Sequence, residues 1–380
     1  MKLTIERAVL FRALSHVQNV VERRNTIPIL SNVLMRADDG KLSLTATDMD
    51  LEMVEGVTAN VEREGATTAP AHTLFDIVRK LPEGAQVELE VAGDGSLLMI
   101  RAGRSSFRLG CLPTEDFPFM ASGEIKAEFT LTSADLRTLI DRTRFAISTE
   151  ETRYYLNGIY LHKAETDGAD VLRAVATDGH RLARVEMPLP EGAAGLGEAE
   201  ADGQAGVIIP RKTVGEIRKL IDDADDDIKI GVSATKIRFS FGDAILTSKL
   251  IDGTFPDYQR VIPEGNDKTL AVDAKSFGSA VDRVATIATE KSRAVKLSLN
   301  ASTLTLSATS PENGSASEEV EVTYDGGELE IGFNSKYLLD ITGQIEGDGC
   351  QLVMADGASP TLIKDPSDPQ SLYVLMPMRV

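Results

Sequence analysis

The chain has 380 residues, of which 42% are hydrophobic and 26% are charged, and its formal net charge is −19. This length and composition suffice for ordinary globular cores, and no apolar run approaches the roughly 18 residues that a membrane span requires. The amino terminus lacks the h-region of a secretory signal, and Cys111 and Cys350 are too few for a disulfide framework or a Cys-x-x-Cys metal site. The composition predicts an ordered protein of the reducing cytoplasm with no membrane association.

A repeated strand motif divides the chain into three copies. The best-defined copy is LRAVATDGHRLARVEM at residues 172–187, which reads as a strand, a tight turn and a second strand. The related segments LSLTATDMDLEM and LTLSATSPENGS place the same Ala-Thr pair at Ala46, Ala176 and Ala308. The spacing of about one domain predicts a domain written three times, with boundaries at 1–122, 123–263 and 264–380.

Apolar residues at three-and-four spacing predict two helices in each copy. The predicted helices cover residues 7–24, 71–81, 133–147, 210–221, 273–293 and 334–346. Many short strands separate them, which predicts an α+β fold.

In the first copy, Arg23 and Arg24 stand at the expected exit of the first helix, where a cation either complements the helix dipole or meets phosphate. Residues 87–91 and 97–101 alternate around a Gly-Asp-Gly turn, as a hairpin does. Next to this hairpin, Arg104 and Arg108 flank Phe107 on a segment that we expect to be an exposed strand, open to pairing with another chain.

In the second copy, Thr132 and Asp135 have the spacing of a helix-capping pair. Residues 191–206 are rich in Gly, Ala and acid without apolar periodicity, which predicts a mobile loop whose role the sequence leaves open. The acidic run at 222–227 lacks the Gly and distal Glu of a calcium loop, so we expect a solvated turn. In the third copy, the terminal LYVLMPMRV is apolar, consistent with either a last core strand or a binding role.

Charge is distributed unevenly along the chain. The six predicted helices together have a net positive charge. The rest of the chain therefore has a net charge more negative than the −19 of the whole chain. A molecule with a basic and an acidic side would bind a polyanion on one side and repel it on the other. The alternative is that the helices are slightly basic by chance.

The usual catalytic motifs are missing from the sequence. There is no Gly-x-x-x-x-Gly-Lys loop, Gly-x-Gly-x-x-Gly, His-Glu-x-x-His or Gly-x-Ser-x-Gly. Asp178 and His180 form the one pair that invites an acid-base interpretation, but two residues apart on a turn they are more simply a capping Asp and an exposed imidazole. We expect no catalytic residue, no metal and no cofactor.

Five segments carry a resemblance to a known family. They are RYYLNG at 153–158, ATDGHRLA at 176–183, TSKLIDGTFPDY at 247–258, EIGFN at 330–334 and the terminal MPMRV. In this order they resemble the bacterial β sliding clamp, the processivity factor of DNA polymerase III, over the whole chain. The resemblance implies three clamp domains of two βαβββ units each, a head-to-tail homodimeric ring and a non-catalytic role in holding the polymerase on DNA.

The resemblance also implies partners and their sites. The partners would be duplex DNA without sequence preference, the polymerase III catalytic subunit, the clamp loader, and other polymerases and repair proteins that carry short clamp-binding peptides. The implied peptide pocket comprises Leu156, Thr177, Gly179, His180, Arg181, Leu182, Pro256, Arg260, Val261, Asn334, Tyr337, Val374, Met376, Pro377, Met378 and Arg379. The implied DNA-facing residues are Arg24, Arg137, Arg144, Tyr154, Tyr155, Arg211, Lys212, Lys291 and Arg293. The implied dimer contact joins Arg104, Phe107 and Arg108 to Ile287, Glu318 and Glu319 of a second copy.

Two other classes of function compete with this interpretation. A hydrolase would use Asp178 and His180, but the sequence offers it neither a nucleophile motif nor a metal site. A three-domain adaptor would bind proteins through its acidic surface and would not bind DNA. Only a clamp would remain on closed circular DNA until the DNA is cut.

Overall fold

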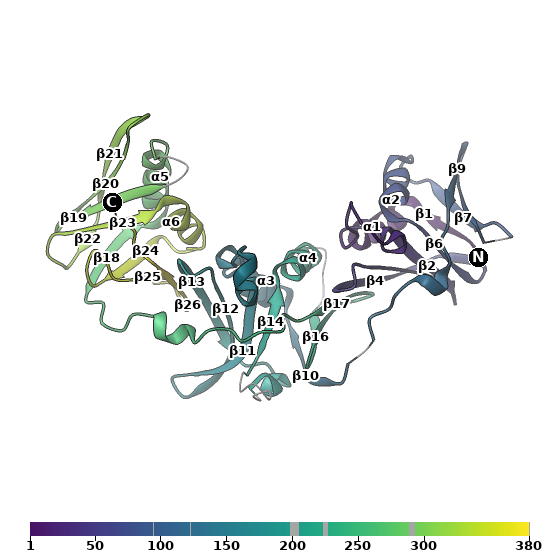
Figure 1. The fold of residues 1–380 in the computed structure, drawn as a ribbon, viewed down its shortest axis with the longest axis horizontal. Helices are drawn as coiled ribbons and strands as arrows, with labels where there is room; N and C mark the ends of the chain where they lie inside the picture. Colours follow the sequence, from purple (N-terminus) through teal and green to yellow (C-terminus); the bar gives the residue numbers. More distant parts are fainter. Residues whose placement is uncertain (94, 122, 198–204, 223–226, 289–292, 380) are drawn as a thin grey trace. The chain divides into compact units, whose positions relative to one another are not determined.

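The computed structural model describes residues 1–380 except 94, 122, 198–204, 223–226, 289–292 and 380 (Figure 1). Its contacts group the chain into two compact units, and each unit collects segments that lie far apart in the sequence. Unit 1 consists of residues 1–136, 190–195 and 212–250, and unit 2 of residues 137–189, 196–211 and 251–380. No helix in the described part of the chain is both long and apolar enough to cross a membrane.

Unit 1 contains two antiparallel sheets. The five-stranded sheet has the order β5 (Asn60–Arg63), β1 (Lys2–Glu6), β7 (Gln86–Val91), β8 (Leu97–Ala102) and β9 (Ser105–Gly110). The eight-stranded sheet has the order β10 (Ile125–Leu131), β15 (Ile228–Ser233), β16 (Lys236–Phe241), β17 (Ala244–Lys249), β4 (Leu51–Thr58), β3 (Lys41–Thr47), β2 (Asn32–Asp38) and β6 (Gly65–Pro70).

Unit 2 follows the same plan. Its nine-stranded sheet has the order β14 (Val207–Pro210), β11 (Gly158–Thr166), β12 (Ala169–Thr177), β13 (Arg181–Pro188), β26 (Asp368–Leu375), β25 (Thr361–Asp365), β24 (Gly349–Met354), β18 (Lys268–Asp273) and β22 (Thr323–Tyr324). Its four-stranded sheet has the order β21 (Gly314–Glu321), β20 (Thr303–Ser310), β19 (Ala294–Leu299) and β23 (Leu329–Asn334). Without β22, the nine-stranded sheet has the strand order of the eight-stranded sheet, with β11, β12 and β13 in the places of β2, β3 and β4.

Six α-helices lie in the described part of the chain at the predicted places, and all except α4 are shorter than predicted. They are α1 (Arg7–Val17), α2 (Ala71–Lys80), α3 (Ser133–Asp141), α4 (Arg211–Asp222), α5 (Ala274–Ala285) and α6 (Ser335–Thr342). In unit 1, α1 contacts α2 and strands of both sheets, and in unit 2, α5 contacts α6 and strands of both sheets (Figure 1). The buried residues of α1 are Leu10, Ala13, Leu14 and Val17, which is the predicted apolar face.

Several local predictions are confirmed. The amide of Asp135 donates to Thr132 Oγ1 at 3.0 Å, so this pair caps α3. Strands β7 and β8 pair antiparallel as the predicted hairpin. The Ala-Thr pairs that begin at Ala46, Ala176 and Ala308 lie in β3, β12 and β20, each the first strand of a hairpin.

Two local predictions are wrong. Helix α1 ends at Val17, so Arg23 and Arg24 lie in irregular chain beyond the helix and do not complement its dipole. The loop at 191–206 is not uniformly mobile, because Ala193–Gly197 form a short 3-10 helix in which Ala193 and Leu196 are buried. The burial of Ala193 and Leu196 holds this short helix against the protein, although Gly and acidic residues surround it in the sequence. Residues 198–204 of the loop and 223–226 of the acidic run lie outside the described residues.

Candidate peptide-binding site

A cavity of about 310 Å³ opens in unit 2 beside the ends of β12, β13 and β26. Its lining comes from four segments: the β12–β13 hairpin, the chain around 153–156, the connector at 256–261 and the chain at 374–376. The lining residues are Arg153, Tyr155, Leu156, Thr177, Gly179, Arg181, Leu182, Pro256, Asp257, Tyr258, Val261, Val374 and Met376.

The floor of the cavity is apolar because paired residues on neighbouring strands, most of them aliphatic, form a row across this face of the sheet. Leu182 pairs with Thr177 on one side and with Val374 on the other, and Val374 pairs with Leu362. Leu156, Tyr258, Leu182, Val374 and Leu362 belong to one buried cluster. Burying an aliphatic side chain of a ligand against this floor is worth roughly 1.5–3 kcal/mol.

The β12–β13 turn is built by polar groups that satisfy one another. Thr177 Oγ1 donates to the carbonyl of Arg181 at 2.7 Å and accepts the amide of Gly179 at 3.1 Å. Asp178 Oδ1 accepts the amides of His180 and Arg181 at 2.9 and 3.0 Å, so this carboxylate caps the turn as predicted. Gly179 has a φ of +86°, so the turn requires glycine, and any Cβ there would also displace the end of the Arg153 side chain, whose Nη1 would be 2.6 Å away.

Arg181 supports the wall from behind. Its guanidinium donates to Asp340 at 2.6 Å, to Asp178 at 3.2 Å and to the Phe145 carbonyl at 2.5 Å, and it lies 4.3 Å from the Tyr337 ring centroid. Its side chain is only 6% exposed. Burial raises the pKa of the Tyr337 phenol, so this ring remains neutral beside the cation. This buried arginine, whose three nitrogens each donate a hydrogen bond within the protein, holds the hairpin in place at the edge of the cavity.

The structure brings nine of the sixteen predicted pocket residues into the cavity lining. They are Leu156, Thr177, Gly179, Arg181, Leu182, Pro256, Val261, Val374 and Met376. Met376 is 41% exposed and Val261 is 50% exposed, so both can move toward a ligand.

The other seven predicted pocket residues lie outside the lining. His180 stacks on Tyr337 with ring centroids 6.2 Å apart, and the amide of Met378 donates to the Gly332 carbonyl at 2.8 Å. Asn334 caps α6 through the amide of Lys336, and Arg260 pairs with Asp257 at 2.7 Å. Pro377 and Arg379 follow Met376, and Arg379 is exposed. The C-terminal segment therefore provides both a core strand, up to Leu375, and an exposed wall residue.

Four lining residues were not predicted for this site. Arg153, Tyr155, Asp257 and Tyr258 belong to the segments RYYLNG and TFPDY. Tyr155 was expected to face DNA, but it is half-buried and packs on the apolar cluster under the cavity. The aromatic residues next to Leu156 and Pro256 were the available signal, since such side chains commonly form the walls of ligand sites.

Most of the predicted DNA-facing residues are at exposed positions. Arg24, Arg137, Arg144, Tyr154, Arg211, Lys212 and Arg293 are exposed, whereas Lys291 lies outside the described residues. Lys212 donates to Glu22 at 3.1 Å and also to Asp48; burial lowers its pKa, but these two carboxylates outweigh burial and hold it above the usual value. Arg144 pairs with Asp141 at 3.1 Å.

The dimer residues lie on or near strands at sheet edges. Phe107 is half-buried and Arg108 exposed on β9, the last strand of its sheet, and Arg104 precedes that strand. Glu318 and Glu319 lie on β21, also a last strand, and Ile287 is half-buried. Glu318 already pairs with Arg283 at 2.5 Å within the chain.

Three family models cover most of the chain. The N-terminal, central and C-terminal domains of the DNA polymerase III beta subunit match residues 1–121, 130–257 and 259–379. The chain belongs to the DNA polymerase III beta subunit family. It is therefore a sliding clamp, a non-catalytic processivity factor with three tandem α+β domains.

Individual relatives agree with this family. The Beta sliding clamp of Caulobacter vibrioides is 56% identical over 380 residues, with all of both chains covered. A crystal structure of a Caulobacter crescentus beta sliding clamp with bound PEG has a TM-score of 0.96 at 56% identity, covering 100% of this chain and 99% of that one. A DnaN sliding clamp from Bartonella birtlesii bound to griselimycin has a TM-score of 0.94 at 52% identity, with both chains fully covered.

Proposed function

We propose that this chain closes with a second copy, head to tail, into a ring around duplex DNA in the cytoplasm and tethers the replicative polymerase. Membership of the clamp family over the full chain is the observation that carries this proposal. The three domains would span residues 1–122, 123–263 and 264–380. A ring holds DNA topologically, so it needs neither base contacts nor tight binding.

The exposed cations suit weak contacts with the DNA backbone. Arg24, Arg137, Arg144, Arg211, Lys212, Lys291 and Arg293 are the proposed phosphate contacts, with Tyr154 and Tyr155 beside them. Lys212 shares its charge with two carboxylates, and Arg144 shares its charge with one. Each phosphate neutralised releases counterions and adds about 0.9 to the log-log salt slope, so partly paired cations favour weak, sequence-independent and mobile contacts.

The cavity of unit 2 is the proposed docking site for partner peptides. Its apolar floor suits a bulky apolar peptide end, and its exposed Met376 and Val261 adapt to different partners. The proposed partners are the polymerase III catalytic subunit, the clamp loader, and other polymerases and repair proteins. The residues beside the cavity, His180, Arg260, Asn334, Tyr337, Pro377, Met378 and Arg379, would contact the peptide where it leaves the floor.

The subunit contact would join the edge strands β9 and β21. Each has one free edge in its own sheet, which is an available template for pairing with another chain. Phe107 and Ile287 would supply apolar area, while Arg104 and Arg108 opposite Glu318 and Glu319 would fix the register.

A retention assay on nicked circular DNA tests this function. The loaded protein should remain on the circle through gel filtration and leave when the DNA is linearised. The matched control is Phe107→Ala with Ile287→Asp, which should sediment as a monomer at micromolar concentration and should not be retained. Equal retention on circular and linear DNA, or a stable dimer of the control variant that is still retained, would overturn the proposal.

The rival hydrolase has little support in the described site. The Asp178 carboxylate accepts two backbone amides and pairs with Arg181, while the His180 ring stacks on Tyr337, so both side chains have structural roles that explain them without catalysis. An adaptor that does not bind DNA predicts no retention in the same assay.

A further inference from the structure

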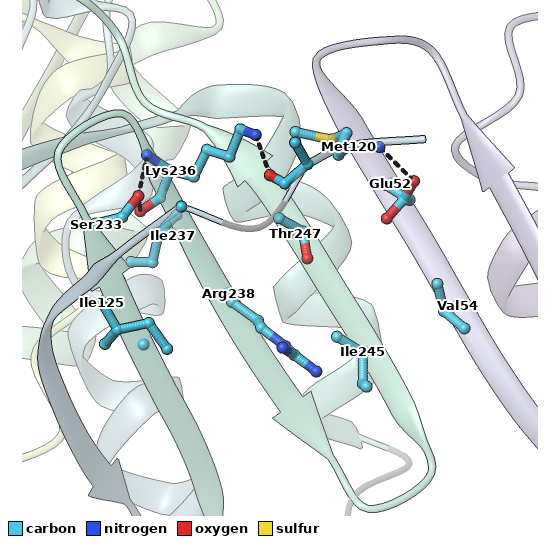
Figure 2. Close-up of a pocket in the computed structure, with 13 residues that line it drawn as sticks. Glu52, Val54, Met120, Ile125, Ser233, Lys236, Ile237, Arg238, Ile245 and Thr247 are labelled. Atoms are coloured by element: carbon cyan, nitrogen blue, oxygen red, sulfur yellow. Dashed lines mark hydrogen bonds between the residues drawn. The ribbon is translucent and has the colours of Figure 1, made fainter. Parts of the chain in front are cut away.

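Unit 1 contains a trench of about 230 Å³ on the face of its eight-stranded sheet (Figure 2). Strands β4, β16 and β17 form its floor, and Met120, Ala121 and Gly123 form one wall. The lining includes Val54, Ile125 and Ile245 as apolar surface, and Glu52, Lys236 and Arg238 as charged groups.

The trench overlaps the place in unit 1 that corresponds to the peptide cavity of unit 2. Across unit 2 the paired row is Thr177, Leu182, Val374, Leu362 and Val353. Across unit 1 the corresponding row is Thr47, Glu52, Thr247, Arg238 and Gly231, with the same hairpin register. Both rows therefore cross the same positions of equivalent sheets.

The covering connectors also correspond. Phe117-Pro118 precedes the trench, and Phe255-Pro256 precedes the cavity. Phe117 is 3% exposed and Phe255 is 5% exposed, so each phenylalanine anchors its connector in the core. Counting from this shared pair places Met120 where unit 2 has Tyr258.

The chemistry of the two floors differs. Leu182 and Val374 in the cavity lining, and Leu362 in the buried cluster beneath it, correspond to Glu52, Thr247 and Arg238 in the trench. A wholly apolar peptide end that suits the cavity would desolvate two charged groups in the trench, which disfavours it there.

Glu52 is largely satisfied by its own surroundings. Its Oε2 accepts the amide of Met120 at 3.0 Å (Figure 2). Lys236 donates to the Ala121 carbonyl and lowers the pKa of Glu52, but burial dominates and raises it. Glu52 and Lys236 thus hold the connector against the sheet.

Arg238 is the charged group left for a ligand. Its exposed side chain extends along the floor toward Ile245 (Figure 2), and it makes no ion pair with any described residue. The opposite neighbour in the row is Gly231, and the Ile125 side chain lies over it, since a Cβ at Gly231 would stand 3.4 Å from Ile125 Cδ1. A carboxylate can form two parallel hydrogen bonds to a guanidinium, and its aliphatic neighbours can pack on Ile245, Val54 and Ile125.

We propose that the trench is a second peptide-binding groove, which takes an extended segment carrying a carboxylate between aliphatic side chains. Arg238 binds the carboxylate, and Glu52 discriminates against the apolar peptide ends that the cavity takes. The groove extends the proposed peptide-docking function, on which it rests, to partners with a different sequence pattern.

Methyl NMR of the full-length protein tests this inference. The probe is acetyl-Ala-Ile-Glu-Leu-Ala-amide, and the control peptide has Gln in place of Glu. The Glu peptide should shift the Ile125 and Ile245 methyl signals, and the Gln peptide should bind about tenfold or more weakly. Arg238→Gln should remove this difference, whereas Arg238→Lys should retain part of it. Arg238 is exposed, so unchanged thermal unfolding of both variants is expected.

The outcomes separate the two proposals. A Leu-Phe-terminated peptide containing Gln serves as a probe of the cavity, read at Leu182, Val261 and Val374. If that peptide shifts the cavity signals while the Glu peptide leaves Ile125 and Ile245 unmoved at millimolar concentration, the second groove is overturned and the docking function stands. Equal binding of the Glu and Gln peptides, or shifts from the Glu peptide in the cavity only, also overturns the groove. Absence of cavity shifts with the Leu-Phe peptide counts against the docking function instead.

Discussion

The eight-stranded sheet of unit 1 and the matching strands of unit 2 share order and register but differ in what covers them. In unit 2 the row next to the cavity pairs His162 with Arg173 and Arg173 with Glu186, all three buried. The corresponding row in unit 1 pairs Arg36 with Ser43 and Ser43 with Gly56, and Arg36 is exposed. One backbone plan therefore supports a buried polar network in one unit and a solvated face in the other.

Tyr258 explains the difference. Its hydroxyl accepts from Arg173 Nη1 at 3.0 Å and lies 3.0 Å from His162 Nε2, and its ring lies 5% exposed in the cluster under the cavity. Met120, at the equivalent place in unit 1, has no such hydrogen-bonding group. The connector of unit 2 is thus fixed to the sheet by a network that also forms the base of the binding site.

The largest expected effect comes from breaking this network at Arg173. Glu186 pairs with Arg173 at 2.8 Å, so Arg173→Leu leaves this buried carboxylate with only the longer contact to Arg184 at 4.0 Å. We expect a loss of about 3–5 kcal/mol in the free energy of unfolding, measured by urea titration. Adding Glu186→Leu should recover most of this loss, because the unpaired charge is then gone. In unit 1, Ser43→Ala should change stability by less than about 0.5 kcal/mol. A small effect of Arg173→Leu alone would show that the pair is solvated.

The second effect is a dependence of stability on pH that resides in unit 2. Burial lowers the pKa of His162 to about 4, and the charge of Arg173 acts in the same direction. The neutral ring donates its Nδ1–H to the Lys163 carbonyl at 2.8 Å and accepts the proton of the Tyr258 hydroxyl at Nε2. Below about pH 6.5 the unfolded chain binds a proton at this position that the folded chain does not bind until pH falls to about 4.

Stability should therefore be at its full value above about pH 6.5 and fall as pH decreases toward 4, by up to ~3 kcal/mol from this group. The check is urea unfolding at a series of pH values for the native chain and for His162→Gln. The variant should show a shallower decline over this interval. Parallel declines for the two proteins would mean that His162 titrates normally in the folded chain.

The sequence predicted the repeat, the element order and most of the cavity floor, because apolar periodicity and short motifs report on local structure. It predicted the helices 7–24 and 273–293 too long, since the apolar pattern continues into turns that pack on the core, such as Val20 and Val21 after α1. It missed Tyr258 and Arg153 as site residues because their roles depend on contacts across 85 and 26 positions of sequence, to Arg173 and Gly179 respectively. The equivalence of Glu52 and Leu182 could not be predicted, because it follows from how the strands pair in each sheet, and a hydrophobic pattern carries no information on that pairing.

The smallest expected effect comes from a single substitution that gives the floor of the cavity the side chain found in the trench. Leu182→Glu places the trench residue in the cavity, among the buried apolar side chains of Val374 and Leu156. The bound peptide loses one aliphatic contact, worth roughly 1.5–3 kcal/mol, so the affinity for a Leu-Phe-terminated peptide should fall by about one to two decades. Leu182→Met is the matched control, because a swap of similar volume should cost less than about 1.5 kcal/mol. Fluorescence anisotropy with the labelled peptide gives both affinities, and sedimentation shows whether the dimer persists. Unchanged affinity of a folded Leu182→Glu protein would mean that the peptide does not reach this row of the sheet, and that the apolar floor of unit 2 is core alone.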